Sequence, residues 1–252
     1  MTQSRQPILN APAVIVALLA LLLLVHLVRT LLLSPDADRY LLILFAFIPA
    51  RLSPSILPGT VWPGGWPADI WTFVTYAFLH ADWAHLGVNS IWLLAFGSPL
   101  ARRFGVARFL AFFAVTAAAG AAAHLAVYAD RGVPVIGASA AISGMMAGAM
   151  RFVFQSGGPL FRRGADDSSY RMPAVPLGAA LRNPRILTFL AVWLGINLVF
   201  GLGGVSFGGE EQAIAWQAHI GGFAAGLLLF GFFDPVPPGP WPEHESPPPD
   251  VA

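Results

Sequence analysis

The sequence predicts an all-α integral membrane protein, a bundle of six transmembrane helices with a long membrane-associated first loop. Hydrophobic residues make up 56% of its 252 residues and charged residues only 11%, whereas a soluble domain carries about 25% charged residues. The mean hydropathy of +0.67 agrees with this class. Uncharged stretches of about 20 residues, long enough to cross a bilayer, also recur along the chain.

Six of these stretches are predicted to be membrane-spanning helices. They cover residues 11–33, 84–101, 107–129, 135–154, 184–204 and 212–233. No small-residue cleavage site of the A-x-A type follows the first stretch, so we expect it to be retained as a helix and not removed as a signal peptide.

Residues 34–79 differ from the predicted spans. They mix charged residues with tryptophan and proline, most densely in Trp62-Pro-Gly-Gly-Trp-Pro-Ala-Asp-Ile-Trp71. Sequence that is rich in tryptophan and interrupted by proline and glycine is typical of a loop at the membrane interface. We therefore predict an interfacial loop, in which Tyr40 to Ile48 form a short helix on or partly in the membrane.

The distribution of arginine predicts the orientation, because every cationic side chain is an arginine. With six spans and the N-terminus inside, ten arginines fall on the inner side and three on the outer side, with one near-membrane arginine left out. This obeys the positive-inside rule, so both termini are predicted to be cytoplasmic. We divide the chain into an N-terminus at 1–10, a six-span domain at 11–233 and a proline-rich tail at 234–252. The tail cannot bury a core and is predicted to be disordered.

Two polar side chains, Ser139 and His219, lie inside long uncharged segments. Such a residue is expensive in a membrane and marks a candidate functional site. A hydroxyl and an imidazole are the minimum parts of a base-activated nucleophile, although either residue taken singly is better interpreted as a structural hydrogen-bonding group. No aspartate or glutamate lies in a predicted span, so the sequence permits a Ser-His dyad and no Ser-His-Asp triad at depth.

The predicted topology allows these two side chains to meet. Both spans run inward, which puts Ser139 and His219 in the outer half of the membrane at comparable depth. Small residues on the two helices would let their backbones approach closely. They form two GxxxG faces, one at Gly144 and Gly148 and the other at Gly222 and Gly226.

A second polar pair lies on the second predicted span. His85 and Asn89 are four residues apart, hence on one helical face, and also fall in the outer half of the membrane. Both can donate hydrogen bonds to an oxyanion, as acyl transfer requires. The four polar groups together therefore favour a hydrolytic site over a structural network.

Other polar residues have weaker claims. Ser143 is on the same helical face as Ser139 and is a rival nucleophile. His80 is expected to brace a loop, and His26 and His124 are interpreted as structural because the sequence offers them no partner.

Several classes of function are excluded or disfavoured. The net charge of +1 and the absence of a basic patch argue against a nucleic-acid partner. The chain has no cysteine and no H-E-x-x-H motif, so we expect no metal site, and we expect no cofactor. A small transporter or channel remains an alternative, but coupled transport usually uses intramembrane carboxylates.

The residues described so far resemble one family, the rhomboid intramembrane serine proteases. The resemblance covers roughly residues 40 to 233. It is carried by three motifs, in the order expected and on the second, fourth and sixth predicted spans: His85-x-x-x-Asn89, Gly137-x-Ser139 and His219-x-Gly-Gly-x-x-x-Gly226.

The resemblance implies a rhomboid-like bundle in which Ser139 attacks and His219 acts as general base and then acid. His85 and Asn89, with the Ser139 N–H, would hold the oxyanion. The fifth span, Ile186 to Leu202, would be a lateral gate. The expected partners are the lipid bilayer and single-span transmembrane substrates, and the expected location is a bacterial inner membrane.

The chain departs from the family pattern at three positions. Ala140 follows the serine where glycine is usual, Ser143 stands where an aromatic residue often packs on the histidine, and Thr72 replaces an arginine that often follows the loop tryptophan. We expect these changes to affect rate and substrate preference. A pseudoprotease that binds membrane clients without cutting them is the alternative within the same fold.

Overall fold

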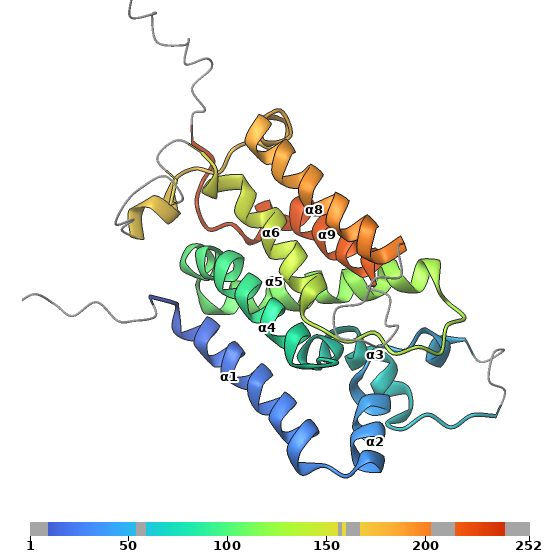
Figure 1. The fold of residues 1–252 in the computed structure, drawn as a ribbon. Helices are drawn as coiled ribbons and strands as arrows, with labels where there is room; N and C mark the ends of the chain where they lie inside the picture. Colours follow the sequence, from blue (N-terminus) through green and yellow to red (C-terminus); the bar gives the residue numbers. More distant parts are fainter. Residues whose placement is uncertain (1–9, 54–58, 156–157, 160–166, 203–214, 240–252) are drawn as a thin grey trace, which may run out of the picture.

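A computed structural model describes residues 10–53, 59–155, 158–159, 167–202 and 215–239, and these residues fold almost entirely into helices (Figure 1). The described part contains no β-strand; one antiparallel bridge pairs Phe47 with Val135. The α-helices are α1 (Ala13–Leu27), α2 (Pro35–Phe45), α3 (Gly65–Thr75), α4 (Trp83–Trp92), α5 (Ser98–Val127), α6 (Ser139–Val153), α7 (Leu177–Ala180), α8 (Pro184–Leu202) and α9 (Trp216–Phe233). Short π-helical turns, Val28–Leu32 and Leu93–Gly97, extend α1 and join α4 to α5.

Three helical runs in the described residues are long and apolar enough to cross a membrane: Ala13–Leu32, Trp83–Val127 and Trp216–Phe233. The second run contains two helices, because the backbone breaks at Gly105 with φ 73° and ψ 170°. This break falls between the predicted spans 84–101 and 107–129. A shorter apolar helix covers Pro184–Val199. The described residues thus form an all-helical fold with helices able to cross a membrane, and the count of six spans stays a prediction.

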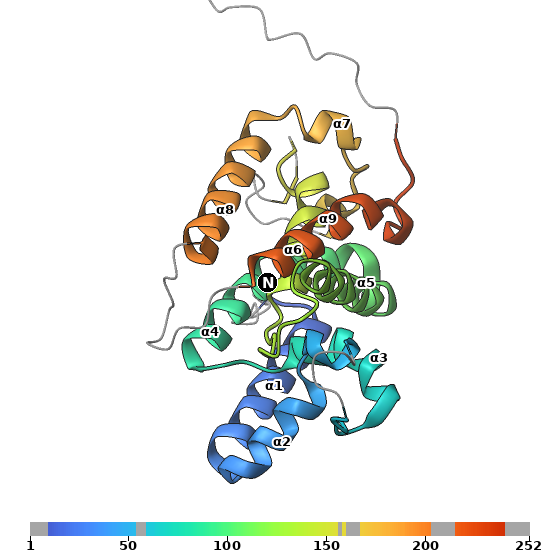
Figure 2. The same cartoon turned by 90° about the vertical axis from the view of Figure 1, so that its right-hand side faces the viewer.

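Helix α6 is shorter than the predicted span 135–154. It begins only at Ser139, because Val135 pairs with Phe47 and Gly137 adopts a φ of 119°. Its 15 residues rise about 22 Å. Nearly all of them are buried, and α4, α5 and α9 pack around the helix, which lies at the centre of the bundle (Figures 1 and 2). The helix that carries the candidate serine therefore lies in the interior of the bundle, while Ser139 itself, at its first position, is half-buried.

The region predicted as an interfacial loop, residues 34–79, contains two short α-helices, α2 and α3, and its place at the membrane interface stays a prediction. Helix α3 begins at Gly65 within that segment. Its proline lies in the first turn, where the backbone N–H has no intrahelical partner, and so does not interrupt the helix. The predicted helix from Tyr40 to Ile48 overlaps α2, which ends earlier, at Phe45. It also begins earlier, at Pro35, because the Ser34 hydroxyl accepts from the Ala37 N–H and caps it.

Two side chains of α3 and one from the turn after α2, Pro49–Leu52, satisfy the last carbonyls of α2. Arg51 donates to the Ile43 carbonyl, Trp71 to the Leu44 carbonyl and Thr75 to the Phe45 carbonyl, at 3.1, 3.0 and 2.7 Å. The last four carbonyls of a helix lack intrahelical partners, so these contacts fix the position of both helices. The tryptophan and arginine of this segment therefore have a structural role.

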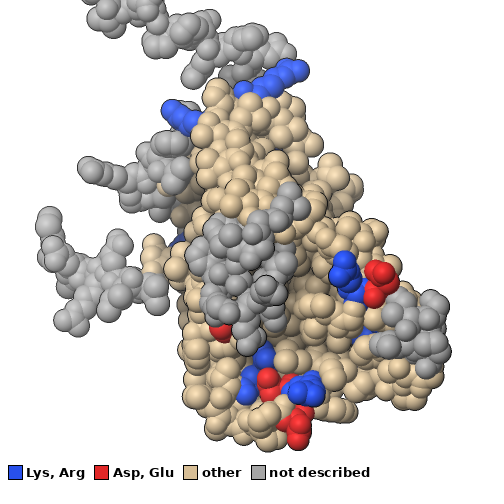
Figure 3. All heavy atoms as spheres, turned by 45° about the vertical axis from the view of Figure 1, so that its right-hand side comes forward, with Lys and Arg blue, Asp and Glu red and all other residues tan. Residues whose placement is uncertain are grey.

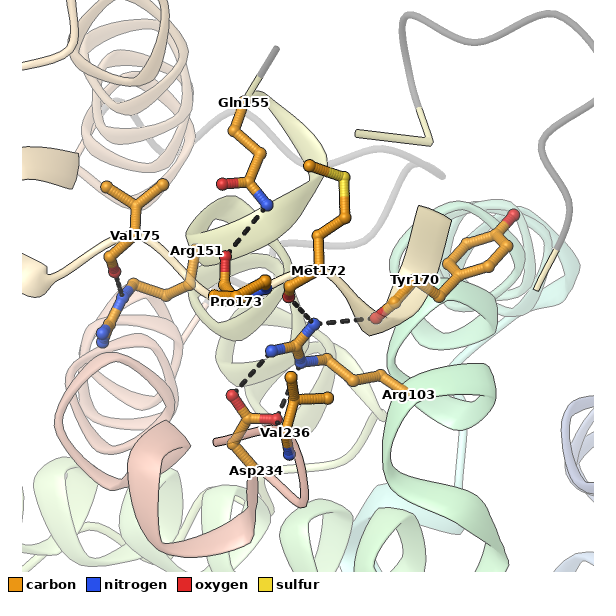
Figure 4. A network of polar contacts seen from close by, with 9 residues as sticks. All are labelled: Arg103, Arg151, Gln155, Tyr170, Met172, Pro173, Val175, Asp234 and Val236. Atoms are coloured by element: carbon orange, nitrogen blue, oxygen red, sulfur yellow. Dashed lines mark hydrogen bonds and ion pairs between the residues drawn. The ribbon is translucent and has the colours of Figure 1, made fainter. Parts of the chain in front are cut away.

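A buried ion pair joins the start of α5 to the residue after α9 (Figure 4). The Arg103 guanidinium donates two hydrogen bonds of 2.8 Å to the Asp234 carboxylate, and it also donates to the carbonyls of Tyr170 and Met172. Both ion-pair side chains are nearly inaccessible to solvent. The contact closes one end of the bundle. The rest of the predicted tail lies mainly in residues 240–252, outside the described residues, as do residues 1–9 of the predicted N-terminus.

Charged side chains are few on the face drawn in Figure 3, and most of those visible lie toward one end, with a broad uncharged area beside them. Large apolar side chains that face outward include Leu24, Ile91, Val199 and Leu228. They belong to α1, α4, α8 and α9. An exposed apolar surface of this kind is suited to contact with lipid.

Candidate active site

Ser139 occupies the first position of α6, and the preceding segment is held from both sides. The Gly137 N–H donates to the Tyr76 carbonyl at 3.0 Å, and Val135 exchanges backbone hydrogen bonds with Phe47. The first intrahelical bond here runs from the Ile142 N–H to the Ala138 carbonyl. The N–H of Ser139 therefore belongs to the first turn of the helix. The N–H groups of that turn have no intrahelical acceptors and point out of the positively polarised end of the helix.

His219 on α9 lies against this serine. Its Nε2 is 2.7 Å from the Ser139 Oγ, a hydrogen-bond distance. The two residues are 80 positions apart in the sequence. Their helices, α6 and α9, correspond to the predicted spans 135–154 and 212–233. The contact has the geometry that a general base needs toward the hydroxyl it activates.

Glycines explain how α9 comes close enough to α6. A methyl group at Gly222 would overlap the backbone of Ala140, and one at Gly226 would overlap the backbone of Gly144. The close approach that the small-residue faces predicted is thus observed. On α6, Gly144 also faces the side chain of Thr116 on α5, where a Cβ would come within 2.5 Å.

His85 borders the same small volume as the serine. A Cβ placed on Gly137 would lie 2.6 Å from the His85 Nε2 and 3.7 Å from the Ser139 Oγ. The Asp82 carboxylate caps α4 by accepting from the His85 N–H at 2.7 Å, and the Ala81 N–H approaches the His85 Nδ1 at 3.5 Å. An N–H directed at Nδ1 favours the tautomer that carries its proton on Nε2, the nitrogen on the serine side.

Asn89 is buried one turn further along the same face of α4. One N–H of its carboxamide donates a hydrogen bond of 3.0 Å to the His85 carbonyl. In the described residues no hydrogen bond joins either His85 or Asn89 to Ser139. The structure therefore brings Ser139 and His219 into contact and sets His85 and Asn89 beside them.

Asn197 was not a candidate from the sequence, yet it contacts the histidine directly. This residue of α8 presents its Oδ1 to the His219 Nδ1 at 2.5 Å. A signal existed: Asn197 is a carboxamide inside an apolar span, and the rule that singled out Ser139 and His219 applies to it equally. What the sequence did not contain was the identity of its partner.

Ser143, the rival nucleophile, is buried, and its hydroxyl donates a hydrogen bond of 2.8 Å to the Ser139 carbonyl. It shows the i to i−4 bonding common for serine inside a helix. No histidine forms a hydrogen bond with it in the described part of the chain. The geometry favours Ser139 as the hydroxyl that a base can reach.

The remaining histidines of the described residues, His26, His80 and His124, are buried. His80 packs edge-on against the His85 ring, with centroids 5.1 Å apart, and neither of its ring nitrogens has a hydrogen-bond partner among the described residues. Burial, followed by the nearby charges of His85, His26 and Arg29, lowers the pKa of His80 to about 3. The buried ring packs against His85 beside the site, and its role in bracing a loop stays a prediction. No three His, Asp or Glu side chains of the described residues converge in a way that would hold a metal ion.

The site contains a hydroxyl, a base within hydrogen-bond distance, and a helix N-terminus beside an imidazole and a carboxamide. A family model described as the Rhomboid domain matches residues 67–234, a range that includes each of these groups. The human protein Rhomboid-related protein 3 (Homo sapiens) is 37% identical over 76 residues. The aligned segment covers 30% of this chain and 18% of the human protein, so most of that relative lies outside the match.

Proposed function

The chain belongs to the rhomboid family, and from this premise we propose that it is an intramembrane serine endopeptidase with a Ser139–His219 dyad. The observation that carries the proposal is the 2.7 Å contact between the Ser139 Oγ and the His219 Nε2. A hydroxyl is a weak nucleophile until a base takes its proton, and this contact provides the base.

The reaction begins when the Ser139 Oγ attacks the carbonyl carbon of a substrate peptide bond. His219 takes the hydroxyl proton on its Nε2 and then donates it to the departing amine. The acyl-enzyme ester is hydrolysed when His219 activates a water molecule in the same way. No carboxylate takes part, in keeping with the cost of burying one at this depth.

The oxyanion of the tetrahedral intermediate would be held by the Ser139 backbone N–H, His85 and Asn89. The first N–H groups of α6 are available at a positive helix end, and the His85 Nε2 borders the same volume as the serine. Asn89 keeps a second amide N–H beyond the one donated to the His85 carbonyl. Removing one such donor typically lowers the rate about 10²- to 10³-fold.

The substrate class proposed is single-span transmembrane proteins, cleaved in the outer half of the bilayer. The buried position of α6 and the apolar outward faces of the surrounding helices support a site reached from lipid. The positive-inside distribution of arginine supports cytoplasmic termini, and we propose a bacterial inner membrane as the location.

The experiment is fluorophosphonate labelling of the full chain in detergent, followed by cleavage of a panel of single-span substrates in liposomes. We expect the wild type to label and to cut, and Ser139→Ala and His219→Ala to do neither. Ser143→Ala is the matched control, because it removes a hydroxyl one turn away on the same helix. Labelling lost in Ser143→Ala but retained in Ser139→Ala would transfer the nucleophile to Ser143, and a wild type inert in both assays would indicate a pseudoprotease.

A further inference from the structure

The carboxamide of Asn197 has both of its ends occupied. Its Oδ1 lies 2.5 Å from the His219 Nδ1, and its Nδ2 donates to the Trp193 carbonyl at 2.8 Å. The residue is buried, although its neighbours Ile196 and Val199 are 51% and 61% exposed. Asn197 is thus the residue through which α8, whose other side chains here face largely outward, contacts the site.

The orientation of this carboxamide follows from its second partner. The Trp193 carbonyl can only accept a hydrogen bond, so the NH₂ group must face it and the Oδ1 must face His219. Rotating the amide would set two oxygens against each other, at the Trp193 carbonyl. An Oδ1 can only accept, so the His219 nitrogen opposite it has to donate.

That requirement determines the tautomer of the histidine. A neutral imidazole carries one proton, and here the proton must lie on Nδ1. The Nε2 then presents its lone pair to the Ser139 Oγ, which is the form able to remove the serine proton. We infer that Asn197 is a positioning residue, which holds His219 in the tautomer and ring orientation needed to activate Ser139. This inference rests on the proposed function.

An asparagine suits this position for a physical reason. It offers the oxygen acceptor that an aspartate offers in a Ser-His-Asp triad, but it carries no charge that would have to be buried in a membrane. Because the orienting residue is neutral, it selects the tautomer without the added stabilisation of an imidazolium that a carboxylate would supply.

The position of Asn197 depends on how α8 docks. The Trp193 ring stacks on Phe223 of α9 with centroids 4.6 Å apart, and Phe189 packs against Phe96 and Phe154. Trp193 therefore does two things: its ring holds α8 against α9, and its carbonyl orients the carboxamide one turn later. The base is complete when α8 is packed in this way.

The test compares Asn197→Leu, Asn197→Asp and Thr188→Val in the full chain in detergent. Leucine fills a similar space without an acceptor, aspartate restores an acceptor, and Thr188 is an exposed polar residue of the same helix that serves as the control. We expect Asn197→Leu to lower the fluorophosphonate labelling rate and kcat about 10- to 100-fold with little change in KM, below the ~10⁴-fold loss known for a triad with the wrong tautomer. Asn197→Asp should regain much of the rate, and Thr188→Val should label like the wild type.

A second readout does not depend on activity. In protein labelled with ¹⁵N-histidine, the His219 signals, assigned by their loss in His219→Ala, should show a protonated Nδ1 and an unprotonated Nε2, and Asn197→Leu should shift this population. A wild type with the proton on Nε2 would overturn the inference, even if Asn197→Leu failed to fold. So would unchanged labelling and an unchanged tautomer in that variant. A wild type that is inert but carries the Nδ1 proton would contradict the protease proposal and leave the orienting contact supported.

Discussion

The contact between α6 and α9 yields a quantitative prediction for Gly226→Ala. An alanine Cβ at this position would lie 2.5 Å from the Gly144 Cα and would overlap the Gly144 carbonyl. Ordinary carbon contacts are about 3.5–4.0 Å long, so the helices would have to separate by about 1 Å. Overpacking of this kind costs about 1–3 kcal/mol.

The same separation would stretch the hydrogen bond between Ser139 and His219 beyond its 2.7 Å length. A misplacement of about 1 Å can lower a catalysed rate about 100-fold. We therefore expect Gly226→Ala to lose most of its fluorophosphonate labelling even where it remains folded. Labelling rates and tryptophan-monitored melting in detergent measure the two effects separately.

Gly231→Ala is the matched control, because Gly231 is on the same helix and has nothing within 4 Å of the added Cβ. Both variants gain about the same 0.5–1 kcal/mol from replacing a helical glycine, so their difference isolates the packing cost. That difference corresponds to a melting temperature about 2–12 °C lower for Gly226→Ala. Equal melting temperatures and equal labelling rates in the two variants would refute the close approach of these backbones.

Three further predictions follow from single contacts. Burial lowers the pKa of His80 to about 3 from its ordinary 6.5, so the unfolded chain binds this proton first and stability is lost as the pH falls from about 6.5 to about 3. In His80→Gln, the melting temperature should depend less on pH within this range. An unchanged slope would contradict the lowered pKa of His80. Asp234→Asn breaks a buried ion pair and should cost about 3–5 kcal/mol, whereas Asp69→Asn, whose side chain is 32% exposed, should cost under about 1 kcal/mol in the same denaturation assay. Gly137→Ala places a Cβ 2.6 Å from the His85 Nε2 at a φ of 119° and should lose labelling; Gly132→Ala, with open space around it, should keep it, and equal labelling would argue against the contact.

The apolar segments were predictable because a membrane-spanning helix is recognised from consecutive residues alone, as the run of uncharged residues that a bilayer requires. Helices α1, α8 and α9 lie within or close to the stretches predicted from hydropathy. The two glycine faces were predictable for a similar reason, since their spacing puts small residues on one side of a helix.

The helix α3 inside the predicted interfacial region was not predicted. Proline and glycine usually interrupt helices, but α3 begins within the Gly-Gly-Trp-Pro run, because in the first turn a proline costs no hydrogen bond. The start of α6 was predicted four residues too early, because the pairing of Val135 with Phe47 is a contact between residues 88 positions apart that no local pattern contains.

The sequence by itself determined the membrane class, the apolar segments and the two polar residues, Ser139 and His219, that are costly enough in a membrane to mark a site. Tertiary structure alone decided which of two serines has the base beside it: Ser139 contacts His219, and Ser143 donates to a backbone carbonyl one turn earlier. It also revealed Asn197 as the third member of the contact, because a hydrogen-bond partner is set by where helices pack. The spacing of residues along the chain shows only which of them share a face of one helix. The contact of α6, α8 and α9 at the His219 imidazole depends on how all three helices pack.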